Sequence, residues 1–521
     1  MELTLRPPTD RSGPSSLSAL WQPVFIAFIA SACMMMLEII AGRITAPYIG
    51  YSLYTWTLII VVVLASTGLG NYLGGRLADR WASPRFLGGI LAVGGLASLC
   101  ILAVDALKRL MTLQSLTLSN LPLIVGLVAF ALLLFFVPCT ILGAVSPVVA
   151  RLTVRDLGTT GSAIGRIYAA GSLGSIVGTF AAGFVLISSL GTHAAVWGIG
   201  WLLAMLGLLF SLGRRWPWVL PIVLAVIAGT ALVFGQGGLH GPCIRETDYF
   251  CIQVREEQHQ GRRVLALYLD RLLHSFSSPD DPTQLVYEYE KLYADTTAYQ
   301  AQRKGGQLRT LFIGGGGYTF PRYVEAVYPG STIHVVEIDP GVTEVAYQML
   351  GLRRDSGIVT YNEDARMFLA RQPSGQYDLI LGDAFNDFSV PYHLTTKEFN
   401  DRVHAWLADD GLYVVNIIDG PWGQFLRAYT HTLRQTFQHV YLAFTIESWR
   451  QSPRSTLVLI AGDVPLDMPA LRTAGPLLAS QLLSDAEVEA LLTEGRVVTL
   501  TDRYAPVDQM LMRVFLDQVP R

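Results

Sequence analysis

The sequence predicts a multi-pass α-helical membrane domain followed by a doubly wound α/β domain with a small β extension in front of it. Charged residues make up only 15% of the 521 residues, against roughly a quarter in an ordinary soluble protein. Long apolar runs fill the chain up to about Phe234, and most acids and bases come later. From Gly241 onward, short apolar runs alternate with helical segments. We therefore expect a tail (1–22), a membrane domain (23–235), a β extension (241–280) and the α/β domain (281–521).

Crossing a bilayer takes roughly 20 consecutive apolar residues, and seven stretches approach that length. They are Pro23–Gly42, Leu53–Gly74, Phe86–Val104, Leu121–Val137, Ile164–Ile187, Ala194–Leu212 and Trp216–Phe234. The first is not a removable signal peptide, because Glu38 and Arg43 stand where small residues should allow cleavage. We expect a multi-pass protein of the cell membrane, with the lipid bilayer as its partner.

The orientation of these spans follows from the arginines and lysines in the loops. One side carries ten: Arg6, Arg11, Arg76, Arg80, Arg85, Arg151, Arg155, Arg166, Arg214 and Arg215. The other side carries Arg43, Lys108 and Arg109, so the amino terminus should be cytoplasmic. Seven spans would then place the segment after Phe234 outside. Because the cofactor inferred below is made in the cytoplasm, the side of the soluble domain stays open.

Two features of the chain bear on packing. Cys243 and Cys251 flank a short polar stretch, and they either close a small disulfide in an oxidising compartment or remain two buried thiols on a strand pair. In the apolar half, small residues at four-residue spacing allow helices to approach closely. Such ridges are Gly174, Gly178 and Ala182 in the fifth span, and Gly70 and Gly74 in the second.

The polar half begins with two antiparallel strands, Ile252–Val254 and Val264–Leu269, and a helical segment, Thr283–Thr297. A βαβ rhythm follows, with five short apolar runs typical of a buried parallel sheet. They are Leu311–Ile313, Ile333–Val336, Ile358–Tyr361, Leu379–Leu381 and Leu412–Asn416. We expect a capping box of Thr395 and Glu398 to start one of the intervening helices.

The ends of four successive strands offer a glycine run and then three acids. Gly314, Gly315, Gly316 and Gly317 follow the first strand and let the backbone approach a ligand closely. Glu337 ends the next strand, 23 positions after Gly314, where an acid receives ribose hydroxyls in nucleotide-binding folds. Asp364 and Asp383 follow the next two strands. A glycine run alone can be a simple turn, and a lone acid is usually just a solvated surface residue. Ligands bind at the carboxyl ends of the strands in such sheets, so the ordered set of glycines and acids predicts a nucleoside site.

The pattern favours a nucleoside with little phosphate. The chain has no phosphate-binding loop ending in Gly-Lys-Ser/Thr, and Tyr318 with Thr319 replaces the last small residue of a dinucleotide loop. Acids repel pyrophosphate but accept ribose hydroxyls and a cationic sulfonium, so S-adenosylmethionine or its decarboxylated form fits. A formal charge of -3 and the lack of a basic tract give no sign of a nucleic-acid partner.

The residues from about Glu246 to Gly462 resemble the spermidine synthases, polyamine aminopropyltransferases, and especially the membrane-fused bacterial branch. The resemblance rests on Glu-Thr-Asp-Tyr, Leu-Tyr-Leu-Asp, Tyr287-Glu288, the glycine run, Val-Val-Glu-Ile-Asp, Asp364-Ala365, Asp383-Ala-Phe and Pro391-Tyr-His-Leu-Thr-Thr-Lys-Glu-Phe. It implies a Rossmann-like, methyltransferase-type fold in which Gly314, Gly315 and Gly316 cradle the cofactor.

By the same resemblance, Glu337 holds the ribose, Asp364 and Ala365 contact adenine, and Asp383 accepts the proton of the attacking amine. The implied donor is decarboxylated S-adenosylmethionine, which leaves methylthioadenosine, and the implied acceptor is putrescine, giving spermidine without a metal. A bacterial inner membrane is the implied location, and a homo-oligomer is left open.

Departures from the family pattern fall on the acceptor side. Gly317 and Tyr318 stand where soluble members have an Asp after the glycines, Asn386 replaces a second Asp, and Phe250 replaces a Gln. Substitutes for these acids are Asp270, Glu288 and Asp387, while Tyr287 and Trp449 either cover a cationic chain or pack in the core. Two alternatives therefore stay open: methyl transfer from S-adenosylmethionine, and a non-catalytic transporter or sensor that binds a polyamine or nucleoside.

Overall fold

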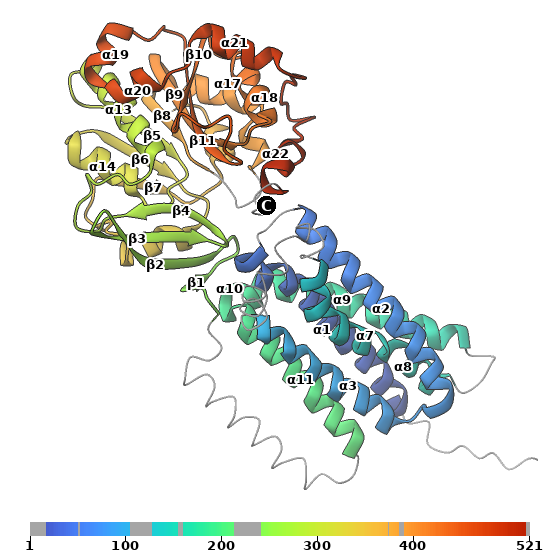
Figure 1. Ribbon diagram of the computed structural model, residues 1–521. Coiled ribbons are helices and arrows are strands. Elements are labelled where there is room, and N and C mark those ends of the chain that lie inside the picture. The colour runs from blue at the N-terminus through green and yellow to red at the C-terminus, as the bar shows by residue number, and fades with distance from the viewer. Residues whose placement is uncertain are drawn as a thin grey trace, which may run out of the picture. The chain divides into compact units, whose positions relative to one another are not determined.

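The computed structural model describes residues 17–49, 53–104, 128–154, 160–212, 241–373, 375–384 and 390–516. These residues form two compact units (Figure 1). The first holds the described residues within 1–42, 58–107 and 128–240, and the second holds those within 43–57, 108–127 and 241–521.

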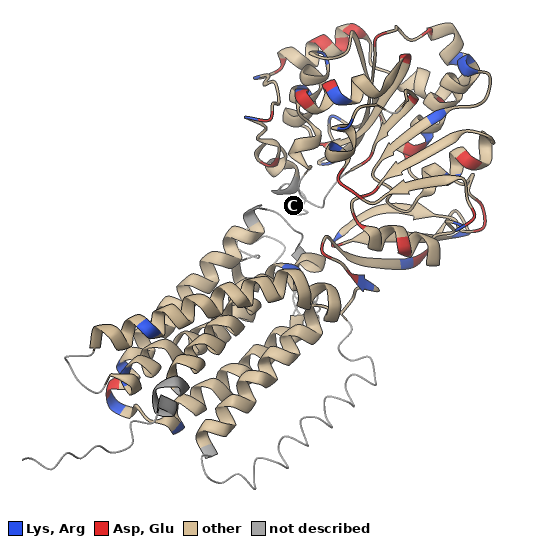
Figure 2. Ribbon diagram, turned by 180° about the vertical axis from the view of Figure 1, so that it is seen from behind, with Lys and Arg blue, Asp and Glu red and all other residues tan. Residues whose placement is uncertain are grey.

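The first unit is helical and largely uncharged. Its elements begin with α1 (Leu17–Ile49), α2 (Leu53–Trp81), α3 (Pro84–Ser98) and η1 (Leu99–Ala103), and the end of α1 and the start of α2 belong to the second unit. They continue with η2 (Leu132–Phe136), α7 (Val137–Gly143), α8 (Val145–Thr153), α9 (Thr160–Ala181), η4 (Ala182–Leu186), α10 (Ile187–Leu190) and α11 (Thr192–Leu212). Figure 2 shows these helices almost free of acidic and basic residues.

Among the described residues, six helical stretches are long and apolar enough to cross a membrane. They are Pro23–Tyr48, Thr55–Trp81, Pro84–Ala103, Val128–Thr153, Thr160–Leu190 and Thr192–Ser211. The predicted seventh stretch, Trp216–Phe234, lies outside the described residues. The fourth stretch continues to Thr153, beyond the predicted end at Val137, because the helix resumes as α8 after a short break at Ala144.

Close helix contacts occur at the predicted glycine ridges. A Cβ added at Gly174 would lie 2.1 Å from the Phe28 carbonyl oxygen, and one at Gly178 would lie 2.3 Å from that of Ala32. At Gly70 the nearest atom would be the Thr140 carbonyl oxygen, at 2.2 Å. No side chain fits at these distances, so glycine is what lets the helix backbones touch.

The second unit contains two sheets. The smaller sheet is antiparallel and has the order β1 (Arg245–Glu246), β2 (Cys251–His259), β3 (Arg262–Leu269), β4 (Leu272–Ser277). The larger has the order β10 (His439–Phe444), β11 (Ser455–Gly462), β9 (Leu407–Asp419), β8 (Tyr377–Gly382), β5 (Arg309–Ile313), β6 (Thr332–Val336), β7 (Ile358–Tyr361). The five neighbouring strands β9, β8, β5, β6 and β7 are parallel, whereas β11 runs antiparallel to both β9 and β10.

Helices cover both faces of the larger sheet, which confirms the doubly wound prediction. They are α13 (Glu288–Lys304), α14 (Thr319–Val327), α15 (Pro340–Gln348), α16 (Ala365–Leu369), η6 (Tyr392–Leu394), α17 (Lys397–Trp406), α18 (Gln424–Leu433), α19 (Met468–Ala474), α20 (Pro476–Gln481), α21 (Asp485–Thr493) and α22 (Val507–Leu516). Successive residues of β5 point to opposite faces: Leu311 and Ile313 enter one hydrophobic core and Phe312 the other.

Two local predictions were wrong. Helix α13 begins at Glu288, five residues after the predicted start at Thr283, and continues to Lys304. The N-cap of α17 is Thr396 instead of Thr395, and its hydroxyl accepts the Phe399 N–H. The Glu398 carboxylate accepts the Asp502 N–H, so it does not complete a capping box. At the start of α13 the Glu290 carboxylate accepts the Tyr287 N–H, and at the start of α17 the Thr396 hydroxyl accepts the Phe399 N–H. These side chains satisfy backbone donors that the sequence pattern had assigned to other residues.

Candidate functional site

A cavity of about 360 Å³ lies at the carboxyl ends of β5, β6, β7 and β8, within the size range of small-molecule sites. Six of its lining residues are acidic: Asp248, Asp270, Glu337, Glu363, Asp364 and Asp383. Gly314, Gly316 and Ala365 also line it, together with His274, His393 and Arg43. The surplus of carboxylates favours a cationic or hydroxyl-rich ligand over an anionic one.

The glycine loop after β5 is fixed to Glu337. One carboxylate oxygen of Glu337 accepts the Gly315 N–H at 2.7 Å and the Gly316 N–H at 3.4 Å, and the other accepts the Asp339 N–H at 2.9 Å. Burial raises the pKa of Glu337, and these backbone donors act against that rise. The same carboxylate therefore shapes the loop and lines the cavity, with one acceptor site left on the oxygen that accepts the Asp339 N–H.

Asp364 is the N-cap of α16 and also faces the cavity. Its Oδ1 accepts the N–H groups of Arg366 and Met367, at 2.8 and 3.1 Å. Its Oδ2 lies 3.0 Å from His393 Nε2. Ala365 follows directly and lines the same wall. The cap contacts use only Oδ1. A ligand in the cavity would therefore meet Oδ2 and its partner His393.

Asp383 follows β8 and is held by two neutral donors. The Tyr289 hydroxyl donates to Asp383 Oδ2 at 2.8 Å, and Asn416 Nδ2 donates to Oδ1 at 2.9 Å. Burial raises the pKa of Asp383, and the two hydrogen bonds act to lower it. Gly314 packs against this position, since a Cβ there would lie 2.4 Å from the Asp383 carbonyl oxygen. A carboxylate with a raised pKa in a cavity is suited to accept a proton.

The smaller sheet and the turn before β2 supply the opposite wall. Asp248, Tyr249 and Phe250 line the cavity from this turn, Asp270 lines it from the turn after β3, and His274 lines it from within β4. Burial and then the charge of Arg454 lower the pKa of His274 to about 4, so the ring is neutral at physiological pH. Its Nε2 is buried and has no hydrogen-bond partner among the described residues.

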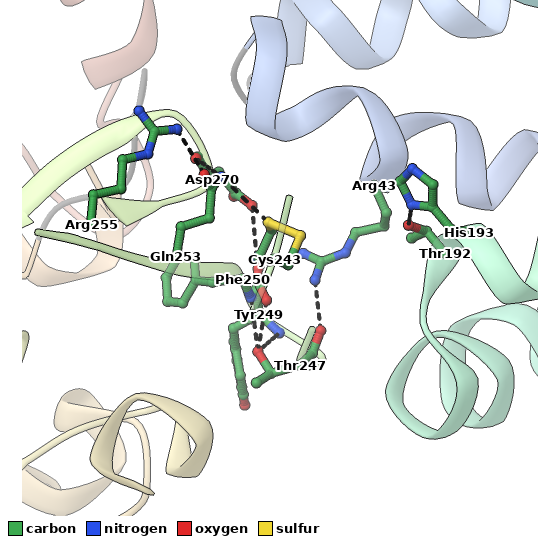
Figure 3. The surroundings of a disulfide bond; sticks show 11 residues. Arg43, Thr192, His193, Cys243, Thr247, Tyr249, Phe250, Gln253, Arg255 and Asp270 are labelled. Atoms are coloured by element: carbon green, nitrogen blue, oxygen red, sulfur yellow. Dashed lines mark hydrogen bonds between the residues drawn. A yellow bond between two sulfur atoms is a disulfide. The ribbon is translucent and has the colours of Figure 1, made fainter. Parts of the chain in front are cut away.

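A disulfide between Cys243 and Cys251 clips this wall (Figure 3). It settles the alternative that the sequence left open, with a Cα–Cα distance of 5.3 Å. Asp270 Oδ1 accepts the Cys251 N–H at 2.9 Å beside the bond. Arg43 donates to the carbonyl oxygens of Thr247 and Tyr249, the turn enclosed by the disulfide. These contacts fix the backbone from which Tyr249 and Phe250 face the cavity.

None of the remaining predicted residues that the structure describes lines the cavity. Tyr287 donates its hydroxyl to the Leu273 carbonyl at 3.1 Å and is not among the lining residues. Glu288 pairs with Lys291 and its side chain is 49% exposed. Asp387 and Asn386 lie outside the described residues. Trp449 is buried in a hydrophobic core. Tyr318 is buried behind the glycine loop, where its hydroxyl contacts Thr343 and Thr360.

Four residues of the site were missed by the sequence analysis: Tyr289, Asn416, His274 and His393. Tyr289 and Asn416 belong to α13 and β9, far from Asp383 in the chain, and no spacing rule links them to it. His274 is an ordinary position in a short strand. His393 lies within the Pro391-Tyr-His motif that supports the family resemblance, so the sequence does contain a signal for it.

A polyamine aminopropyltransferase of Vibrio vulnificus is 31% identical over 214 residues, which cover 38% of this chain and 69% of the relative. A probable polyamine aminopropyl transferase of Bifidobacterium longum is 31% identical over 149 residues, 28% of this chain and 32% of that one.

An N-terminal histidine N-methyltransferase of Emericella nidulans is 34% identical over 142 residues, 26% of this chain and 25% of the relative. Among solved structures, a probable spermidine synthase from Corynebacterium glutamicum matches with a TM-score of 0.43 and 22% identity, over 48% of this chain and 93% of its own. No family model matches the chain.

Proposed function

This chain belongs to the polyamine aminopropyltransferase family, and from that membership we propose that it moves a propylamine group from decarboxylated S-adenosylmethionine to an amine. The family makes it a transferase that uses an adenosyl co-substrate. The single observation that carries this proposal is the placement of Asp383, half-buried and without a cationic partner among the described residues, in the cavity lined by Glu337 and Asp364.

In the proposed reaction the acceptor amine attacks the methylene carbon bonded to the sulfonium. A carbon–nitrogen bond forms, the carbon–sulfur bond breaks, and its electron pair stays on sulfur, which leaves as neutral methylthioadenosine. An aliphatic ammonium has a pKa near ~10.4 by analogy with lysine, so the amine must lose a proton to react. Asp383 accepts that proton, since each carboxylate oxygen keeps a lone pair beyond its contact with Tyr289 or Asn416.

Glu337 and Asp364 have different tasks in this proposal. Glu337 accepts the ribose hydroxyls next to the glycine loop, and Asp364, beside Ala365, receives the adenine. The six lining acids attract the sulfonium and the ammonium groups of both substrates. Putrescine is the proposed acceptor. Among the described acids that line the cavity, Asp270 is the one we propose for its far ammonium group.

The test uses the purified full-length protein in detergent with each donor and a panel of diamines and monoamines. Mass spectrometry follows methylthioadenosine and the aminopropylated amine. We expect turnover with decarboxylated S-adenosylmethionine and a loss of about 10²–10⁴-fold in Asp383→Asn with donor binding retained. Asp378→Asn is the matched control, because Asp378 lies on β8, the strand that Asp383 follows, but pairs with Lys304 away from the cavity. Normal turnover by Asp383→Asn would remove Asp383 as the base.

Methyl transfer is the second candidate, and the similarity to a histidine N-methyltransferase favours it. It predicts S-adenosylhomocysteine as product from the carboxylated donor in the same assay. Binding of nucleoside or polyamine without any product from either donor would instead support a transporter or sensor.

We propose an integral protein of the bacterial inner membrane, supported by the six long apolar helices. The Cys243–Cys251 disulfide favours an oxidising compartment for the second unit, because cytosolic thiols are kept reduced, whereas the proposed donor is made in the cytoplasm. A carboxyl-terminal reporter active on only one side of the membrane decides between the two. A cytoplasmic signal would favour the transferase, and an external signal would favour the transporter or sensor.

A further inference from the structure

The first unit contains a carboxylate that the proposed transferase reaction does not use. We propose that Glu38 is the anionic ligand of a site for one monovalent cation, a metal ion or an ammonium group, among the long apolar helices, and that the Thr140 hydroxyl is its neutral ligand. This site goes beyond the transferase function, since both residues belong to the first unit and neither lines the cavity of the second.

Glu38 lies deep within an apolar helix. The part of α1 that is long and apolar enough to cross a membrane runs from Pro23 to Tyr48. Tyr48 comes ten positions after Glu38, which is about 15 Å of α-helix, or half of a hydrocarbon core about 30 Å thick. The neighbouring Leu37 and Ile40 are buried. Ionisable residues at this depth are costly, and they commonly mark ion pathways or binding sites.

Glu38 has no counter-charge in the part of the chain that the structure describes. No hydrogen bond or ion pair joins it to another described residue. The helices of this unit are almost free of acidic and basic residues (Figure 2), and its other described acid is Asp79, which is exposed near the end of α2. One carboxylate balances one positive charge. A divalent ion would leave an uncompensated charge in an apolar medium, so the ligand should be monovalent.

A broken helix lies next to Glu38. Cys139 of α7 is close enough for the Glu38 charge to act on its thiol. Helix α7 directly follows the π-helical η2 and ends at Gly143, and the span resumes as α8 after Ala144. Such interruptions take carbonyl groups out of the regular hydrogen-bond ladder and occur frequently at functional sites. Carbonyl groups freed in this way within a span can coordinate a cation.

A second π-helical segment lies at the same level of the helices. Helix α9 packs on α1 in the same direction, because Gly174 and Gly178 lie against carbonyl groups four residues apart on α1, in the same order. The second of these carbonyl groups belongs to Ala32. Six positions further along both helices, Glu38 is level with Phe184, in the middle of η4. Glu38 therefore stands at a depth where two neighbouring spans depart from regular α-helix.

Thr140 supplies an unused hydroxyl on the broken helix. It directly follows Cys139, and its Oγ1 is buried without a hydrogen-bond partner among the described residues. Thr67 and Thr179 instead donate their hydroxyls to the carbonyl four residues earlier, as is common within helices. For Thr140 that carbonyl belongs to Phe136, the last residue of η2. The Thr140 hydroxyl is therefore left for a ligand, beside the residue on which the Glu38 charge acts.

The test is the protection of Glu38 from dicyclohexylcarbodiimide, measured on the full-length protein in detergent. This reagent enters apolar regions, adds to a protonated carboxyl and leaves an N-acylurea that peptide mass spectrometry detects. Glu38→Gln must lose the adduct, which identifies its position. In buffer free of alkali metal ions, we expect labelling at acidic pH and slower labelling as the pH rises and the carboxyl loses its proton.

Sodium, potassium and propylammonium ions are then added one at a time, with choline chloride at the same ionic strength as the control. One of the three should slow the labelling of Glu38 by about tenfold at about ten times its apparent Kd. Protection by sodium or potassium identifies a metal-ion site, and protection by propylammonium identifies an ammonium site. Labelling that no cation slows, equal slowing by choline, or no labelling even at acidic pH would overturn the proposal. This measurement uses the wild-type chain and depends on no variant.

Thr140→Val tests the neutral ligand. Valine keeps the shape of threonine without its hydroxyl, so the cation concentration for half-maximal protection should rise about fivefold, the effect of losing one neutral hydrogen-bonding group. Thr67→Val is the matched control, because the Thr67 hydroxyl already donates to the Val63 carbonyl at 2.7 Å. Unchanged protection in Thr140→Val, or an equal rise in Thr67→Val, would remove Thr140 as a ligand. Transferase turnover plays no part in these measurements, so the failure of either proposal leaves the other standing.

Discussion

Substitution of Gly314 by alanine tests how closely the glycine loop and Asp383 depend on each other. The backbone at Gly314 has φ +97°, and an added Cβ would lie 2.4 Å from the Asp383 carbonyl oxygen. Real Cβ contacts essentially never fall under 3.0 Å, so the two segments must separate by at least about 0.6 Å. Displacements near 1 Å cost catalysis as much as about 10²-fold, and we expect kcat to fall by about tenfold or more.

Gly306 provides a matched control for the backbone strain in this experiment. Its φ is +96°, but an added Cβ meets nothing within 4 Å. Positive φ costs a non-glycine residue roughly 1–2 kcal/mol, which lowers the midpoint of thermal unfolding by about 2–3 °C for a unit of about 280 residues. We expect Gly306→Ala to show that shift with normal kcat, and Gly314→Ala to lose both stability and kcat. Equal kcat values in the two variants would refute the argument that glycine is needed at 314 to place Asp383.

Two further perturbations act on stability. The Cys243–Cys251 disulfide closes a loop with a sequence separation of 8, so Cys243→Ser or reductant should cost about 2.5 kcal/mol, or about 4 °C in the unfolding midpoint. Cys100→Ser removes an exposed free thiol and should change nothing, and a midpoint insensitive to reductant would contradict this prediction. Glu290 is buried, and its pKa of about 8 exceeds the ordinary value of 4.5, so the folded chain holds a proton that the unfolded chain releases. The contribution of Glu290 to the free energy of unfolding is present below pH 4.5 and is lost as the pH rises through about 8, by about 1.4 kcal/mol per pH unit. Glu290→Gln should flatten this pH dependence of stability, measured by urea unfolding. An unchanged slope would show that the group titrates normally.

The sequence by itself determined the apolar half, the doubly wound sheet and the four strand ends that line the cavity. Each follows from a local rule: length of apolar runs, βαβ alternation, and the fact that parallel strands end at one edge of a sheet. Gly314, Glu337, Asp364 and Asp383 therefore came together as the spacing predicted. The antiparallel strands β10 and β11 were not predicted.

Only the tertiary structure decided what surrounds Asp383 and what closes the cavity. Tyr289 and Asn416 are 94 and 33 positions away from Asp383 in the chain, and the docking of α13 and β9 on β8 brings them to it. His274 and Phe250 face the cavity because the smaller sheet packs there, and the pairing of Cys243 with Cys251 required their measured separation. Local sequence carries no information about contacts between elements that pack side by side only after folding. Packing therefore decided which side chains form hydrogen bonds with the Asp383 carboxylate.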